Sequence, residues 1–250
     1  MPTRDTGADD LGRECEPMTT GPTCSPVPCC ARVMSVRPLL HYALDGDLEN
    51  RGEVPGYAGT STGGTRFIAG ALGGAVSLQL DGEVSFPGTR ELLDVAPQLV
   101  FSLWMRTDGE GRAGLACRSW GHGFETYAGV THDLATCAGD GYGPPRAWGA
   151  CATVPACTAP EWTHVVLRWM GPGTEPEVSS DGIEWRALTA TMGFPVDRYD
   201  LFAYALDLSL GLAVGDESLA RGTIDVDDVR VYDSPIPDDE IWAVTSCPAP

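Results

Sequence analysis

The segment that most constrains the fold runs from Gly222 to Tyr232, with the sequence GTIDVDDVRVY. Its valines are strong β-formers, and aspartates and an arginine are set among them. This pattern is typical of a strand with one buried side and one solvent-facing side. Asp233-Ser234-Pro235 ends the strand, and we expect the acidic segment that finishes at Glu240–Trp242 to pack back against the sheet or to cap its edge.

Further segments carry strand patterns, and turn signals separate them. The alternating residues 75–80 precede Asp81-Gly82, which predicts a hairpin with 83–86 as the returning strand. Asp181-Gly182 predicts a second hairpin, between 177–180 and 183–185. The remaining expected strands are 39–44, 99–105, 162–169 and 206–212, of which 99–105 is apolar enough to be buried on both faces.

The overall arrangement favours an all-β antiparallel sandwich. Residues 111–160 are rich in Gly, Ala and Cys without a sustained pattern, so we expect short strands with large loops there. No unit of about 20–50 residues repeats, which disfavours a propeller or a solenoid. Strands joined by turns, with few helices, are typical of two packed sheets.

Charge and hydropathy exclude two classes of partner. The formal net charge is −19, and all 16 basic residues are arginines. Such a surface repels phosphate backbones, so nucleic acid is excluded as a partner. No run approaches the roughly 18 apolar residues that a membrane helix needs.

Nine cysteines indicate an oxidising compartment, because disulfides persist there. We therefore expect an extracellular or cell-envelope protein. Residues 1–10 contain no apolar signal core. We expect that a signal has been removed or that the start lies further upstream, and the less favoured alternative is a cytosolic chain. Residues 1–35 read as an acidic Cys/Pro-rich linker.

Chain order suggests the disulfide pairs Cys151–Cys157 and Cys117–Cys137. No cysteine spacing is typical of a zinc site.

Four segments resemble one family in order. Gly70–Gly82 is similar to its early hairpin, Phe101–Arg106 and Trp162–Val166 to two of its strands, and Ser180–Ile183 to one of its turns. With the closing strand, the chain from 36 to 250 resembles a laminin-G-like jelly-roll domain of the concanavalin A-like lectin/glucanase superfamily. The resemblance implies a concanavalin A-like jelly roll. It also implies neighbouring termini, and so a bridge such as Cys30–Cys247.

The sequence gives no support for catalysis. Glucanases of this superfamily use Glu-x-Asp-x-x-Glu on one strand, where alternate residues share a face. Glu175 and Glu177 are interrupted by Pro176, and the aspartates of 225–228 lie on a strand that is structural in the family. His164 matches a structural strand position. We therefore predict a protein that is not an enzyme.

Calcium is the cofactor that the acidic loops favour, in a structural role. Asp45, Asp47 and Asn50 offer oxygen ligands within one loop. The resemblance implies that the first and last strands are neighbours, so that Asp227 or Asp228 completes the site. The alternative interpretation is an ordinary turn held by local hydrogen bonds.

Aromatic residues in the Gly-rich region predict a sugar-binding surface. The candidates are Trp120, Tyr127, Tyr142 and Trp148. Trp104, Trp162 and Trp169 lie in expected strands and are assigned to the core. We predict a non-catalytic exported module that binds a glycan or a cell-surface protein. The alternatives are an adhesion domain without a small ligand and, less favoured, a glycan-active hydrolase.

Overall fold

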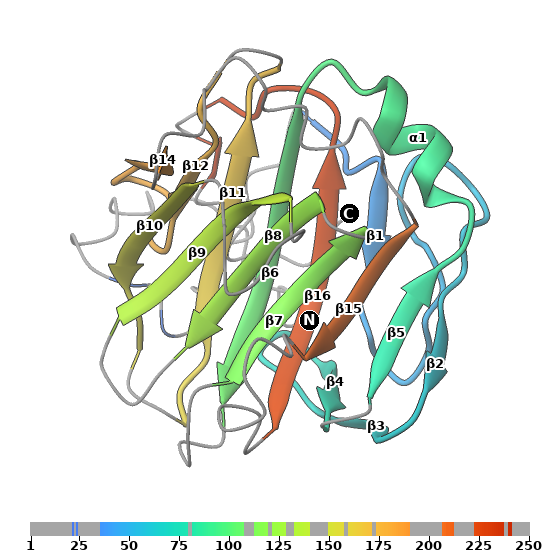
Figure 1. The fold of residues 1–250 in the computed structure, drawn as a ribbon. Helices are drawn as coiled ribbons and strands as arrows, with labels where there is room; N and C mark the ends of the chain where they lie inside the picture. Colours follow the sequence, from blue (N-terminus) through green and yellow to red (C-terminus); the bar gives the residue numbers. More distant parts are fainter. Residues whose placement is uncertain are drawn as a thin grey trace, which may run out of the picture.

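The computed structural model describes residues 22, 24, 36–79, 82–107, 113–119, 122–128, 133–140, 150–157, 160–171, 174–190, 207–212, 223–237 and 240–241. Two eight-stranded sheets face each other, as Figure 1 shows. Every strand pairing within them is antiparallel. The predicted all-β sandwich with a jelly-roll fold is confirmed. The boundary predicted at residue 35 stays a prediction, because nearly all of 1–35 lies outside the described residues.

Sheet A has the strand order β13-β12-β11-β6-β16-β4-β3, and β1 also pairs with β16. Its strands are β1 (Leu40–Tyr42), β3 (Thr65–Ala69), β4 (Gly74–Leu78), β6 (Leu99–Thr107), β11 (Thr163–Trp169), β12 (Glu177–Ser179), β13 (Arg186–Ala187) and β16 (Ile224–Tyr232). The pairing of β1 with β16 confirms that the first and last strands are neighbours.

Sheet B has the strand order β14-β10-β9-β8-β7-β15-β5-β2. Its strands are β2 (Thr60–Thr62), β5 (Glu83–Phe86), β7 (Ala113–Ser119), β8 (His122–Ala128), β9 (Asp133–Asp140), β10 (Ala150–Pro155), β14 (Thr189–Ala190) and β15 (Leu208–Leu212). One short helix, α1 (Thr89–Val95), follows β5. Within the described residues, no helix is long and apolar enough to cross a membrane.

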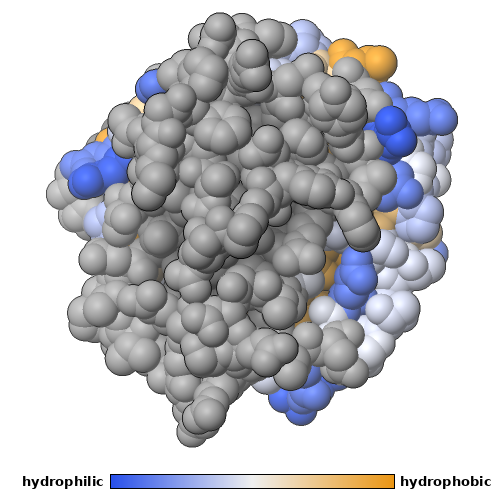
Figure 2. All heavy atoms as spheres, viewed as in Figure 1, coloured by the Kyte–Doolittle hydropathy of each residue, from blue (hydrophilic) through white to orange (hydrophobic). Residues whose placement is uncertain are grey.

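The core lies between the two sheets. One large cluster joins buried residues of sheet A, such as Val226 and Leu103, to buried residues of sheet B, such as Leu210 and Phe86. Tyr42 of β1 stacks on Phe86 of β5 with ring centroids 3.8 Å apart. Fully burying a Val, Leu or Phe side chain stabilises the folded state by about 1.5–3 kcal/mol. Figure 2 shows a mostly polar surface on the side of β2 and β5.

Trp104, Trp162 and Trp169 are buried, as expected for core residues. Trp104 and Trp162 form a separate cluster with Ala75, against which Leu72 and other partly buried residues pack. These tryptophans are therefore not available as a sugar-stacking surface.

β16 differs from its expected one-sided burial, because all nine of its residues are buried. It lies inside sheet A, between β6 and β4, and the segment after it covers part of its outer side. Ile236 and Ile241 pack there against Tyr232, Val100 and Val166. The expected packing of the acidic segment against the sheet is thus confirmed. This packing helps to bury the face of β16 that was predicted to face solvent.

The hairpin predicted at Asp81-Gly82 is wrong. β4 belongs to sheet A, where it pairs with β3 and β16, whereas β5 belongs to sheet B, where it pairs with β2 and β15. The connection is therefore a crossover between the sheets. Turn residues specify that the chain reverses, but they do not specify which sheet receives the next strand.

The second hairpin is present with a later return. β12 pairs with β13, which begins at Arg186 rather than at Ile183. Asp181 Oδ1 accepts hydrogen bonds from the N–H groups of Ile183 and Glu184, both at 2.8 Å. This aspartate therefore uses the residues expected in the returning strand to build the turn.

Residues 111–160 contain more regular structure than expected. β7, β8, β9 and β10 form consecutive antiparallel pairs, so this region supplies half of sheet B. Small residues such as Gly114, Ala116, Ala135 and Gly139 occupy alternate positions of these strands, which weakens the apolar–polar contrast that identifies a strand in a sequence.

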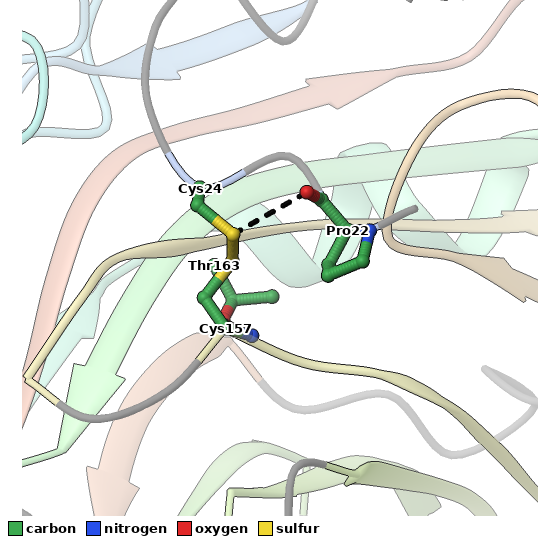
Figure 3. The surroundings of a disulfide bond; sticks show 4 residues. All are labelled: Pro22, Cys24, Cys157 and Thr163. Atoms are coloured by element: carbon green, nitrogen blue, oxygen red, sulfur yellow. Dashed lines mark hydrogen bonds between the residues drawn. A yellow bond between two sulfur atoms is a disulfide. The ribbon is translucent and has the colours of Figure 1, made fainter. Parts of the chain in front are cut away.

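A disulfide joins Cys24 to Cys157, with the two Cα atoms 5.6 Å apart (Figure 3). The predicted Cys151–Cys157 bridge is therefore wrong, because Cys157 is already used. The Cys157 N–H donates to Thr163 Oγ1 at 3.0 Å, which fixes the cysteine beside the start of β11. Cys30 and Cys247 lie outside the described residues, so a bridge between them stays a prediction.

Candidate functional site

The side chains of Asp45 and Asp227 both contact the turn from Gly70 to Gly74. Asp45 follows β1, Asp227 belongs to β16, and the turn from Gly70 to Gly74 joins β3 to β4. Because β1 and β4 both pair with β16, the three segments meet at one place on sheet A. The pairing of sequence-distant strands therefore brings together two carboxylates that are 182 residues apart, as the numbers 45 and 227 give.

The turn offers backbone N–H groups to both carboxylates. The Gly74 N–H donates to Asp45 Oδ1 at 2.5 Å, and the Leu72 N–H donates to Asp227 Oδ2 at 2.8 Å. A Cβ atom on Gly70 would lie 2.5 Å from Asp227 Oδ2, and one on Gly73 would collide with Asp45 Oδ1. Glycine is required at both positions because the turn backbone approaches the carboxylates so closely.

The charge on Asp227 is not fully compensated. Burial raises its pKa from 3.8 to about 7, and the nearby charges of Asp228 and Asp45 add to the rise, against the hydrogen bond from Leu72. Its Oδ1 atom is buried and has no hydrogen-bond partner among the residues that the structure describes. A bound cation at this oxygen would remove the electrostatic cost of the buried charge.

Asp47 and Asn50 make local contacts instead. Arg51 bridges Asp45 and Asp47, with N–O distances of 3.4 and 3.1 Å. Asn50 Oδ1 accepts the N–H groups of His41 and Gly52, both at 2.9 Å, and its Nδ2 donates to the Val54 carbonyl oxygen at 2.6 Å. The Asn50 side chain thus holds the loop backbone, as the turn interpretation expects.

Within the described part of the chain, no group of three or more His, Cys, Asp or Glu side chains is placed to hold a metal ion. A cation between Asp45 and Asp227 would therefore need backbone carbonyl oxygens or water for its remaining ligands. Calcium accepts such mixed oxygen ligands, so the donor chemistry fits it and not a soft metal.

A buried ionic network that local sequence patterns do not reveal lies next to this site. Asp228 contacts His41 Nε2 at 2.7 Å through Oδ1 and Arg230 at 2.6 Å through Oδ2. Burial alone would raise the pKa of Asp228, but the Arg230 charge and the His41 hydrogen bond hold that pKa below its usual value. Asp228 occupies a β-bulge with φ of 51°, a left-handed conformation that Asp tolerates.

His164 is a structural residue, as its strand position predicted. It is fully buried, and its Nε2 atom lies 2.9 Å from Ser102 Oγ. Burial first, and then the Arg230 charge, lowers the pKa of His164 to about 3. A buried neutral imidazole without access to solvent does not serve as a general base for a ligand.

The register of sheet B separates its inner and outer faces. Leu210 of β15 is fully buried in the core and lies opposite Cys117 of β7, which in turn lies opposite Phe124 of β8. Directly opposed residues share a face, and neighbours along a strand alternate. Leu210, Cys117 and Phe124 therefore share the inner face. On β8, Glu125 and Tyr127 are separated from Phe124 by an odd number of positions, so both occupy the outer face.

Small residues occupy most positions of that outer face. Tyr127 lies opposite Gly114 on one side and Ala135 on the other. The outer-face positions are Thr60, Thr62, Glu83, Ser85, Ser209, Gly211, Gly114, Ala116, Arg118, Gly123, Glu125, Tyr127, Asp133, Ala135, Cys137, Gly139, Cys151, Thr153, Pro155 and Thr189. One aromatic position, Tyr127, and four charged positions, Glu83, Arg118, Glu125 and Asp133, therefore occur among mostly small residues on this face. Trp120, Tyr142 and Trp148 lie outside the described residues.

No family model matches the chain, and no curated protein matches its sequence. Solved structures do match. Domain 4 of an extracellular GH43 arabinanase from Geobacillus stearothermophilus, in complex with arabinotriose, has a TM-score of 0.54 and 18% identity, covering 84% of this chain and 98% of that one. The receptor binding domain of botulinum neurotoxin D has a TM-score of 0.57 and 10% identity, covering 83% and 52%.

The binding domain of Paraclostridial Mosquitocidal Protein 1 is similar to the same extent, with a TM-score of 0.56 and 10% identity over 83% of this chain and 51% of that one. The chain thus spans about half the length of these toxin domains and nearly all of the arabinanase domain. At such low identities the likeness concerns the fold. The chain has the β-sandwich fold of an arabinotriose-complexed domain and of toxin binding domains.

Proposed function

We propose that this chain is a non-catalytic, laminin-G-like carbohydrate-binding module that acts outside the cell or at the cell envelope. The observation that carries the proposal is the outer face of sheet B, where Tyr127 lies among small residues. A floor of Gly, Ala and Ser lets a sugar ring approach the sheet closely. An aromatic ring supplies a stacking surface, and a few polar groups then fix the orientation of the ligand.

The charge of the molecule favours a neutral sugar. At a net charge of −19, the protein repels sulfated and other anionic glycans. Glu125 can accept hydrogen bonds from sugar hydroxyls, and Arg118 can donate to them. The similar fold of a domain in complex with arabinotriose supports a linear neutral oligosaccharide as the ligand class.

Replacing Tyr127 by alanine should weaken binding of such an oligosaccharide by about tenfold to a hundredfold, because losing one buried aromatic face costs about 1.5–3 kcal/mol. A glycan array identifies the ligand, and calorimetry with arabinotriose, xylotriose and cellotriose measures the affinity. Phe67→Ala is the matched control, since Phe67 is 44% exposed on β3 at the edge of the other sheet.

Unchanged affinity in a folded Tyr127→Ala protein would remove this face as the binding site. Absence of binding by the unaltered protein to every neutral glycan would overturn the carbohydrate function itself. Binding to a cell-surface protein would then be favoured, in line with the fold shared with toxin receptor binding domains.

We also propose that calcium binds between Asp45 and Asp227 and stabilises the domain. Calcium at a hundred times its dissociation constant should then raise the free energy of unfolding by about 2.7 kcal/mol. Asp45→Ala should abolish this gain, because it removes one of two charged ligands. Asp47→Ala should retain it, since Asp47 contacts Arg51 at the surface. A loss of stability in Asp45→Ala that is equal with calcium and with EDTA would contradict the site.

A further inference from the structure

Two cysteines of sheet B are opposed across one strand pair. In the antiparallel register of β9 and β10, Cys137 lies directly opposite Cys151. Opposed residues of antiparallel strands have Cα atoms about 4.5–5.5 Å apart. Disulfides span about 4.4–6.8 Å between Cα atoms, so this pair meets the distance requirement without movement of the backbone.

Cys117 is placed differently from both. It lies on β7, and β8 separates that strand from β9. Two strand spacings amount to about 10 Å, beyond the reach of a disulfide. Cys117 also lies opposite Leu210, which is fully buried in the core, so Cys117 occupies the inner face. The Cys117–Cys137 bridge expected from chain order is therefore wrong.

Alternation along β10 places Cys151 on the outer face. Val154 of the same strand is buried in the core, and it lies three residues from Cys151. An odd separation along a strand means opposite faces. Cys137 shares the face of Cys151, whereas Cys117 does not, so the two candidates for a bridge within this sheet are Cys137 and Cys151.

We propose that Cys137 and Cys151 form a cross-strand disulfide and that Cys117 remains a free thiol inside the sandwich. Nine cysteines cannot all pair within one chain, and this assignment makes Cys117 an unpaired one. The disulfide forms by exchange with a disulfide oxidant such as glutathione disulfide. The two cysteine thiols lose their protons and join through a new Sγ–Sγ bond, the oxidant's S–S bond breaks, and two glutathione thiols are released.

The bridge would lie within the small-residue face of sheet B. Glu125 of β8 is directly opposite Cys137, and Tyr127 is two residues further along that strand. The crosslink would therefore fix β10 to β9 beside the positions proposed to bind a sugar. This consequence for the ligand face rests on the proposed function, whereas the disulfide itself depends only on the register.

Non-reducing peptide mapping of the full chain, produced under oxidising conditions, tests the assignment. Free thiols are first blocked with N-ethylmaleimide in denaturant, and the protein is then digested with trypsin. Cleavage at Arg118 and Arg146 leaves Cys137 alone in peptide 119–146, and Cys117 alone in peptide 113–118. Peptide 147–168 contains both Cys151 and Cys157, so elastase digestion and fragmentation of the linked species distinguish them.

The expected result is a Cys137–Cys151 crosslink next to Cys24–Cys157, with Cys117 recovered as its maleimide adduct. In the native protein, Cys117 should react at least tenfold more slowly with maleimide than in the denatured protein. Cys137→Ser should free one additional thiol, at Cys151, and Cys117→Ser should leave both crosslinks in place. Recovery of Cys137 and Cys151 as adducts, or linkage of either to another cysteine, would overturn the proposal. Peptide mapping does not measure glycan binding. A failure of the disulfide assignment is therefore distinguishable from a failure of the proposed function.

Discussion

Replacing Arg230 by methionine should lower the free energy of unfolding by about 3–5 kcal/mol, the usual cost of removing one partner of a buried ion pair. Arg230 is fully buried, and its guanidinium lies 2.6 Å from Asp228 Oδ2. Methionine fills much of the same volume, but it leaves the Asp228 carboxylate buried without its main compensating charge. Urea denaturation at pH 7 in EDTA measures the change.

The double variant Asp228→Asn with Arg230→Met should recover part of this loss, because asparagine also tolerates the left-handed conformation at position 228. Arg51→Met is the matched control. Its ion pairs with Asp45 and Asp47 are exposed to solvent, so it should cost about 1 kcal/mol or less. If Arg230→Met lowered the free energy of unfolding no more than Arg51→Met does, the buried ion pair would not stabilise the folded state.

Asp227→Asn should flatten the dependence of stability on pH in the absence of calcium. The native pKa of Asp227 is raised from 3.8 to about 7, mainly by burial. The folded state therefore holds a proton that the unfolded state releases, and stability falls as the pH rises from about 4 to about 7. A pKa rise from 3.8 to about 7 corresponds to about 4 kcal/mol at about 1.4 kcal/mol per pKa unit.

Unfolding free energies at pH 4.5, 6 and 8 in EDTA provide the test. The difference between Asp227→Asn and the unaltered protein should shift in favour of the variant as the pH rises. Asp225→Asn on the same strand is the control, because Asp225 is paired with Arg106 at 2.8 Å. Parallel pH curves for Asp227→Asn and the unaltered protein would contradict the argument. Added calcium should stabilise the unaltered protein at pH 8 and leave Asp227→Asn unchanged.

The strands with clear apolar patterns were predictable from the sequence. Residues 83–86 form β5 as expected, and 99–105 lie within β6. The sheet to which each strand belongs was not predictable, because the Asp81-Gly82 signal describes only a local reversal. The four-strand meander of sheet B was missed because small residues such as Gly114 and Ala135 occupy the outer face, where a pattern search expects polar side chains.

Long-range pairing explains what could and could not be predicted about the site. Asp45 and Asp227 were linked only through a family resemblance that implied neighbouring first and last strands. The burial of Asp228 could not be predicted, because its partner His41 comes from a strand 187 residues away. The role of Asn50 depends on which backbone N–H groups face its side chain, and the residue types alone do not give that geometry.

The central position of β16 in sheet A constrains the order in which the molecule can assemble. β6 lies on one side of this strand and β4 and β1 lie on the other. Before residues 224–232 leave the ribosome, β11 and β6 have no connection through the sheet to β3 and β4. A nascent chain can therefore build two separate sheet fragments, but it cannot close sheet A. Completion of the fold must follow the synthesis of β16, and until then the exposed strand edges on both fragments would need protection from aggregation.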